Sequence, residues 1–263
     1  MIDHDTVASA ASYEAALRAA GAAADAAARL IAGEADFAFC GTRPPGHHAE
    51  RERAMGFCLF NNVAIAAAQA LAECGAERVM VIDWDVHHGN GTQEAFYASD
   101  RVLFASIHQS PLYPGSGDVA ETGAGEGEGY TVNLPVPPGA GPDEFLAIVQ
   151  TILAPIARRY RPDLLAVSAG YDAHRDDPLA ECMLNEAAYA EMSASLRDLA
   201  SELGIGVLAC LEGGYAPRAL AASVSATLRG FTDPTLAARE APAAAAAGHR
   251  RRLAGRWDLE SIT

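Results

Sequence analysis

Two carboxylates and an imidazole alternate along one short stretch of the chain. The stretch VIDWDVHHGNG at 81–91 begins as an apolar run and ends in glycines. Side chains alternate between the two faces of an extended strand, so Asp83, Asp85 and His87 are predicted to share one face. Aspartate and histidine are ligands that Zn²⁺ accepts, and the stretch therefore predicts a metal site. An isolated Asp-x-His leaves an alternative open, in which these side chains cap a helix or bind loop amides.

Apolar strand-like runs alternate with helical patterns along the chain, which is typical of an α/β fold with a mainly parallel central sheet. The predicted strands are 37–40, 79–84, 102–108, 131–135, 164–169 and 206–211. The predicted helices are 9–32, 60–74, 142–160, 186–203 and 217–229. The glycine-rich stretch 115–129 predicts a surface loop. Residues 232–263 predict a peripheral tail, in which a helix is followed by a solvated basic run at 249–256.

The predicted strands end in polar motifs flanked by glycine. RPPGHH follows the first strand at 43–48, SIH closes the third at 106–108, and GYDAH (170–174) and EGGY (212–215) follow the last two. The functional crevice of an open parallel sheet lies at the carboxyl ends of its strands. Six of the eight histidines fall in these ends. The convergence favours a functional site over structural capping.

Composition limits the classes of function. The chain has 263 residues, half of them hydrophobic, so one sizeable domain over 1–263 is expected. The formal charge of −15 argues against a nucleic-acid partner and is compatible with a cationic substrate. Five cysteines form no Cys-x-x-Cys pair, which favours reduced thiols and a cytoplasmic location. No apolar stretch reaches the length that spans a membrane, so no membrane partner is expected.

Five motifs together resemble the zinc-dependent histone deacetylase superfamily, particularly the bacterial class II-like histone deacetylases and the acetylpolyamine amidohydrolases. They are RPPGHH (43–48), GFCLFNN (56–62), DWDVHHGNG (83–91), SAGYDAH (168–174) and EGGY (212–215), and the resemblance covers roughly 6–230. It implies a three-layer αβα fold related to arginase, with one Zn²⁺ per chain at the base of a narrow tunnel.

The resemblance implies a role for each side chain in the metal and proton-transfer motifs. The zinc ligands would be Asp85, His87 and Asp172, which leaves open coordination for water and substrate. Of the tandem pair, His48 would act as general base and acid. His47 would lie nearer the attacking water and supply electrostatic stabilisation.

Further residues are implied to orient these groups and to line the tunnel. Asp83 would bond to His47 and Asn90 to His48, and Tyr215 would donate its hydroxyl to the developing oxyanion. The residues expected to bind substrate are Gly56, Phe57, Tyr113 and Gly170. Those expected to hold a monovalent cation, with K⁺ as the candidate, are Asp83, Asp85, His87, Ser106 and Ile107. Structural roles are the simpler interpretation for Cys58, Cys182 and His108, since none has a partner at metal or nucleophile spacing.

The predicted activity is hydrolysis of the acyl amide of an acetylated lysine side chain or an acetylated polyamine. Two alternatives stay open: an arginase-like ureohydrolase with a binuclear metal site, and a non-catalytic acyl-amine-binding protein with a vestigial site. The tandem histidines and the Gly-Gly-Tyr element argue against the first. The resemblance implies that the usual amino-terminal segment of the superfamily would be missing from this chain. An open tunnel rim and self-association as a homodimer or higher homo-oligomer are therefore expected.

Overall fold

Six parallel strands form the central sheet of the protein. The computed structural model describes residue 2 and residues 5–259, and its strands lie in the order β1-β6-β5-β2-β3-β4. Their bounds are β1 (Phe37–Cys40), β2 (Val79–Asp83), β3 (Val102–Gln109), β4 (Thr131–Val136), β5 (Leu164–Ala169) and β6 (Gly206–Leu211). All five strand pairs are parallel. The six predicted strands are thus confirmed, each within one residue of its predicted bounds.

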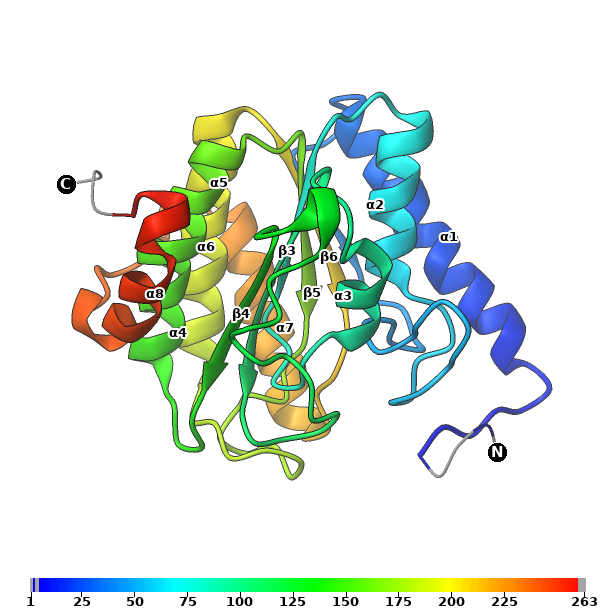
Figure 1. Cartoon of the computed structure of the whole chain (residues 1–263). Helices are drawn as coiled ribbons and strands as arrows, with labels where there is room; N and C mark the ends of the chain where they lie inside the picture. Colours follow the sequence, from blue (N-terminus) through cyan, green and yellow to red (C-terminus); the bar gives the residue numbers. More distant parts are fainter. Residues whose placement is uncertain (1, 3–4, 260–263) are drawn as a thin grey trace.

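Helices cover both faces of this sheet, which gives the three layers that were expected (Figure 1). One face carries α1 (Ser12–Ile31), α2 (Asn62–Glu73) and α3 (Asn90–Phe96). The other carries α4 (Pro142–Ile148), α5 (Ala154–Tyr160), α6 (Glu186–Leu203) and α7 (Pro217–Thr232). The prediction of one helix over 142–160 is wrong in detail, because a π-helical turn, Val149–Leu153, separates α4 from α5. Pro155 follows that turn, and its ring and missing amide hydrogen oppose a regular α-helical turn before it.

Two cores, one on each face of the sheet, explain why its central strands are mostly apolar. The strands β2, β3 and β5 are buried at every residue, as strands of a parallel sheet usually are, whereas the edge strand β1 is buried only at Cys40. Met80 and Ile82 pack into the core beneath α4–α7, whereas Val79 and Val81 pack into the alanine-rich core beneath α1 and α2. No helix in the described part of the chain is long and apolar enough to cross a membrane.

The end of β2 differs from the prediction in one respect. The strand ends at Asp83, so Asp85 and His87 follow it instead of extending it. The alternation nevertheless continues, because Trp84 and Val86 are fully buried in the core beneath α4–α7. The short helix α3, which the sequence pattern did not predict, begins three residues after His87.

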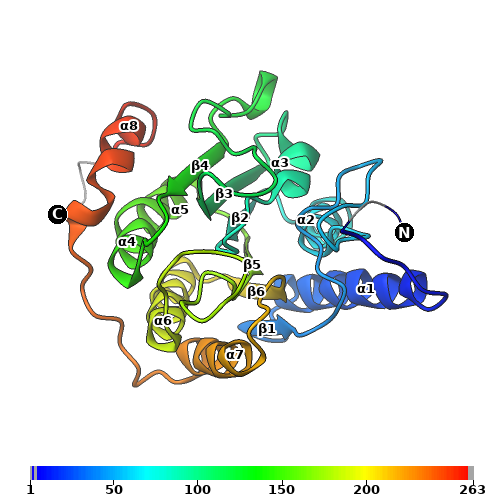
Figure 2. The same cartoon turned by 90° about the horizontal axis from the view of Figure 1, so that it is seen from below.

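The segment after α7 runs past α4 and ends in α8 (Ala247–Trp257), beside the edge strand β4 (Figure 2). Leu253 and Trp257 are buried in the core beneath α4–α7. Arg252 donates to the backbone oxygen of Asn133 at 2.6 Å, and His249 donates to that of Pro135 at 3.1 Å. The prediction of a solvated basic run is therefore wrong in part, because this run also binds the edge of the sheet. Residues 260–263 of the predicted tail lie outside the described residues.

Candidate metal centre and active site

The predicted site residues meet at the carboxyl ends of the central strands. The loops after β1, β2, β5 and β6 each contribute side chains here, beside a cavity of about 270 Å³. Six of the predicted residues line that cavity: His48, Gly56, Phe57, His87, Tyr113 and Tyr215.

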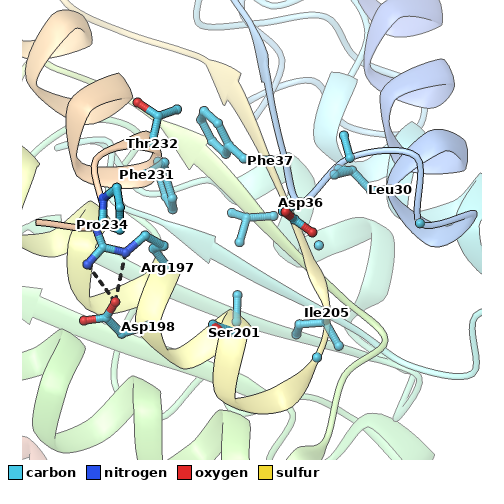
Figure 3. A pocket seen from close by; sticks show the side chains of 16 residues that line it. Leu30, Asp36, Phe37, Arg197, Asp198, Ser201, Ile205, Phe231, Thr232 and Pro234 are labelled. Atoms are coloured by element: carbon cyan, nitrogen blue, oxygen red, sulfur yellow. Dashed lines mark hydrogen bonds and ion pairs between the residues drawn. The ribbon is translucent and has the colours of Figure 1, made fainter.

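A larger cavity of about 650 Å³ lies at the opposite, amino-terminal ends of β1 and β6 (Figure 3). Its walls include Phe37, Ile205 and Phe231, and Arg197 pairs with Asp198 at its side. None of the predicted site residues lines it. The one potential metal-binding group found among the described residues also lies elsewhere. The cavity at the carboxyl ends is therefore the candidate active site.

The three predicted metal ligands come together. Ligand atoms of Asp85, His87 and Asp172 all lie within 4.8 Å of one another. The Nδ1 atom of His87 is 3.2 Å from Asp85 Oδ1 and 3.1 Å from Asp172 Oδ2. Backbone amides hold the other carboxylate oxygens: Gly213 donates to Asp85 Oδ2 at 2.8 Å and Val86 donates to Asp172 Oδ1 at 2.9 Å. One oxygen of each carboxylate is thus fixed while the other faces the imidazole.

The electrostatics of this group favour a positive charge between the carboxylates. Burial opposes protonation of His87, but hydrogen bonds to Asp172 and Asp85 raise its pKa to about 10. Burial and the neighbouring Asp85 raise the pKa of Asp172 to about 6. A divalent cation would supply that charge with the imidazole deprotonated, as metal binding requires. Two carboxylate oxygens and one imidazole nitrogen fit a catalytic Zn²⁺, which typically has three protein ligands.

Two glycines allow backbone to approach the ligands closely. A Cβ atom at Gly213 would lie 2.1 Å from Asp172 Oδ2 and 2.6 Å from Asp85 Oδ2, and one at Gly170 would lie 2.1 Å from Asp85 Oδ2. The structure therefore places Gly170 against Asp85, a predicted metal ligand, and the residues that line the cavity do not include it; its role in substrate binding stays a prediction. Any side chain at position 170 would occupy the space of the Asp85 carboxylate.

The tandem histidines have different partners, as predicted. His47 Nδ1 is 3.0 Å from Asp83 Oδ2, and His48 Nδ1 is 2.8 Å from Asn90 Oδ1. The two ring centroids are 4.0 Å apart. Burial opposes protonation of His47, but the carboxylates of Asp83 and Asp85 outweigh it and hold its pKa well above the ordinary value. Burial and the nearby His47 hold the pKa of His48 well below the ordinary value. The pair therefore divides into a charged and a neutral imidazole, the pattern expected of an electrostatic stabiliser beside a base.

A buried carboxylate, Glu212, holds the backbone of the tandem histidines. It accepts hydrogen bonds from the amides of Gly46 at 2.6 Å and His47 at 3.1 Å, and from the Ser168 hydroxyl at 3.2 Å. Burial raises the pKa of Glu212 to about 7. The EGGY motif predicted a role for its tyrosine but none for its glutamate. A charged residue directly after a wholly apolar strand is the signal that could have identified it.

Tyr215 is held at the cavity by a second carboxylate, that of Asp177, which had no predicted role. Its amide donates to Asp177 Oδ2 at 2.6 Å. Gly214 before it adopts φ +133°, a conformation that L side chains rarely adopt. Burial raises the pKa of the Tyr215 phenol, which keeps the hydroxyl protonated and able to donate a hydrogen bond.

Two aromatic side chains form walls of the cavity, as predicted. The ring of Tyr113 lies edge-on to His48, with centroids 5.1 Å apart, and the ring of Phe57 lies 5.7 Å from that of Tyr215. Gly56 has φ +57°, and a Cβ there would come within 2.4 Å of His48 Cδ2, so only glycine fits. Asp5 also lines the cavity. The rim, which was expected to be open, thus has an acidic residue from the amino-terminal region.

Comparison with known proteins agrees with this geometry. The family model for the histone deacetylase domain matches residues 1–231. The chain belongs to the histone deacetylase family. The crystal structure of the HDA15 HD domain, another member, superposes with a TM-score of 0.90 at 39% identity, over 98% of this chain and 73% of that one.

Archaeal and bacterial proteins are also similar to this family member. This chain is 45% identical to a probable deacetylase of Archaeoglobus fulgidus over 216 residues. The aligned region covers 82% of this chain and 60% of that protein. This chain is also 45% identical to a histone deacetylase-like amidohydrolase of Pseudomonas aeruginosa over 206 residues. That aligned region covers 78% of this chain and 54% of that protein. The match therefore spans little more than half the length of either relative.

Two further histidines lie behind the site of this family member and have structural partners. His88 contacts Ser116 Oγ at 2.8 Å and Gln93 Oε1 at 3.0 Å. His108 contacts Ser106 Oγ at 3.0 Å and donates to the Gly117 oxygen at 3.1 Å. These contacts tie the loop that carries Tyr113 to the sheet, in agreement with the structural interpretation of His108.

Proposed function

We propose that the protein is a zinc-dependent amidohydrolase that removes an acyl group from an acetylated lysine side chain or an acetylated polyamine. The observation that carries the proposal is the close group of Asp85, His87 and Asp172 beside a pair of histidines with opposite pKa shifts. Three ligands leave room for a substrate oxygen, and a neutral imidazole can accept a proton from the attacking water.

Each of these side chains has one role in the proposed mechanism. When bound, the cation would polarise the amide carbonyl and activate water. His48 accepts a proton from that water as its oxygen bonds to the carbonyl carbon. His47, held charged by Asp83, stabilises the negative charge that develops, and Tyr215 donates its hydroxyl to the oxyanion. His48 then returns the proton to the departing nitrogen as the C–N bond breaks, which yields a carboxylic acid and an amine.

The cavity walls support a substrate with an unbranched stem. Phe57 and Tyr113 are placed to enclose methylene groups, and aromatic faces suit such chains. The net charge of −15 favours an amine substrate that is cationic away from the acyl group. Both lysine and polyamine chains meet these requirements.

The two alternative functions have less support. An arginase-like ureohydrolase needs a second metal with its own carboxylates, whereas the described residues contain one potential metal-binding group of three or more ligands. A vestigial binding site would have no need for a base such as His48, whose tautomer is held by a side-chain partner.

We also propose that residues 1–263 form one catalytic domain and that a monovalent cation, K⁺, binds beside the metal centre. Asp83 pairs in register with Ser106, which brings the predicted backbone ligands of Ser106 and Ile107 beside the Asp83–His87 segment.

Because β1 has one neighbouring strand in the described sheet, its other edge can pair with a second copy. Light scattering should then show a dimer or larger assembly, and a monodisperse monomer would contradict this.

The deciding experiment combines metal analysis with turnover on fluorogenic acyl-lysines and acetylated polyamines. We expect one zinc per chain and chelator-sensitive release of acetate. Two manganese ions, with urea released from an added guanidino substrate, would favour the ureohydrolase. Stoichiometric zinc with tight substrate binding and no turnover on any substrate would favour the binding protein.

A further inference from the structure

The Asn90 side chain lies between the imidazole of His48 and a carboxylate that has no assigned role, that of Glu50. Its Oδ1 atom is 2.8 Å from His48 Nδ1. Its Nδ2 atom donates to Glu50 Oε1 at 2.7 Å. His48, Asn90 and Glu50 thus form a chain of hydrogen bonds that leads from the cavity to the surface.

The groups around the Asn90 amide nitrogen fix the direction of this chain. Besides Glu50, the nearest partners of Nδ2 are the His48 backbone oxygen at 3.5 Å and the Met55 sulfur at 3.4 Å, and all three are acceptors. A flipped amide would place Oδ1 against the Glu50 carboxylate, where two acceptors repel each other. The amide oxygen therefore faces His48, and the Nδ1 atom of His48 must carry the proton.

We infer that Glu50 is a positioning residue that sets the tautomer of His48 through Asn90. With the proton on Nδ1, the lone pair of Nε2 is free to act as the base, which the opposite tautomer could not do. A hydrogen bond to a charged acceptor is about twice as strong as one between neutral groups, so Glu50 outweighs the weaker acceptors. The effect on turnover rests on the proposed function, whereas the tautomer does not.

The loop around Glu50 is held so that its carboxylate points at Asn90. The Glu50 amide donates to the Arg53 oxygen at 2.9 Å, and the Arg51 amide donates to Glu94 Oε2 at 2.8 Å. Glu50 itself is half-buried in the wall of a cavity of about 520 Å³, whose charged lining also includes Arg53, Glu94 and Glu121. The chain from Glu50 to His48 is therefore built into the loop and reaches solvent at its far end.

The tautomer can be measured directly in protein with ¹⁵N-labelled histidine, with and without bound zinc. Long-range proton–nitrogen spectra distinguish Nδ1–H from Nε2–H, and His48→Ala identifies the signals. We expect Nδ1–H in the wild type, a mixture in Glu50→Ala, and recovery in Glu50→Gln, whose amide oxygen can still accept. Glu52→Ala removes the same charge from an exposed position in the same loop and should leave His48 unchanged. A single Nδ1–H tautomer in folded Glu50→Ala would overturn the inference.

Kinetics give a second test if the protein is active. Glu50→Ala should lower kcat on the order of tenfold with little change in KM, the loss expected for one hydrogen bond to a charged group. In an Asn90→Ala background the same substitution should have no further effect on kcat, because Glu50 acts through Asn90. Equal losses in both backgrounds would refute the inference and show a structural role. An inactive wild type would refute the proposed function but would leave the tautomer measurement decisive.

Discussion

Substituting Gly213 by alanine tests how closely backbone must approach the metal ligands. The new Cβ would lie 2.1 Å from Asp172 Oδ2 and 2.6 Å from Asp85 Oδ2, against about 3.4 Å for an ordinary contact. The backbone of Gly213 has no positive φ, so the change introduces a clash without conformational strain. To relieve the clash, the Asp172 oxygen would have to move by about 1.3 Å, or β6 would have to shift.

The expected loss follows from the tolerance of metal geometry. Ligand distances in a zinc site hold to within about 0.2 Å, and a displacement of about 1.3 Å far exceeds that limit. Loss of a partner that orients a ligand typically costs 10- to 100-fold in metal affinity. Displacing a ligand should cost at least the upper end of that range, so we expect zinc affinity to fall by about 100-fold, or about 2.7 kcal/mol.

Competition with a chromophoric chelator measures this affinity, and turnover should fall in parallel. Gly21→Ala is the matched control, because it adds the same methyl group in α1, where the new Cβ would have no atom within 4 Å apart from the neighbouring backbone of its own helix. Circular dichroism on both variants checks that the fold is kept. Wild-type zinc affinity in folded Gly213→Ala would refute the assignment of Asp85 and Asp172 as ligands.

Three further outcomes are expected. His87→Ala should leave no stoichiometric zinc after gel filtration with a weak chelator, because two carboxylates alone hold the metal poorly; retained zinc would contradict the ligand set. Tyr215→Phe should keep its zinc but lose about 2.7 to 4 kcal/mol of transition-state stabilisation, the scale of one oxyanion donor; an unchanged kcat would reduce this tyrosine to a cavity wall. Burial lowers the pKa values of His88 and His108 from 6.5 to about 4 and about 3. Both therefore protonate more readily in the unfolded chain, and the free energy of unfolding should fall as pH drops from about 6.5 towards 4. Denaturant titrations measure this slope, which should be shallower in His108→Asn; identical slopes would show that His108 is not responsible.

The strands were predictable because a parallel sheet leaves a direct trace in the sequence. A strand buried on both faces, such as β2 or β5, is apolar along most of its length, and polar residues at or after its last residues mark the carboxyl end. Helix α3 has only seven residues and begins Asn-Gly-Thr, so two turns gave no periodic signal. The π-helical turn before α5 was not predicted either, because a hydrophobic pattern of period 3.6 does not distinguish such a turn from a continuous α-helix.

The site was predictable where residue types carry specific chemistry. The grouping of Asp85, His87 and Asp172 and the partners of the tandem histidines have the predicted geometry, while their roles in catalysis stay predictions. Glu50, Asp177 and Glu212 were missed for a common reason. Each carboxylate acts on an amide that lies in a distant part of the chain, and no spacing rule connects such partners.

The predicted metal ligands follow two strands that lie far apart in the chain, which has a consequence for biosynthesis. Asp172 follows His87 by 85 residues. At ribosomal rates of roughly 5 to 20 residues per second, this interval corresponds to roughly 4 to 17 s. During this interval the emerging chain contains Asp85 and His87 but not Asp172, and β5 and β6 have not yet paired. A sheet whose contacts join such distant segments also forms slowly. The group of Asp85, His87 and Asp172 is thus complete only after the ribosome has delivered β5, the fifth of the six strands in chain order.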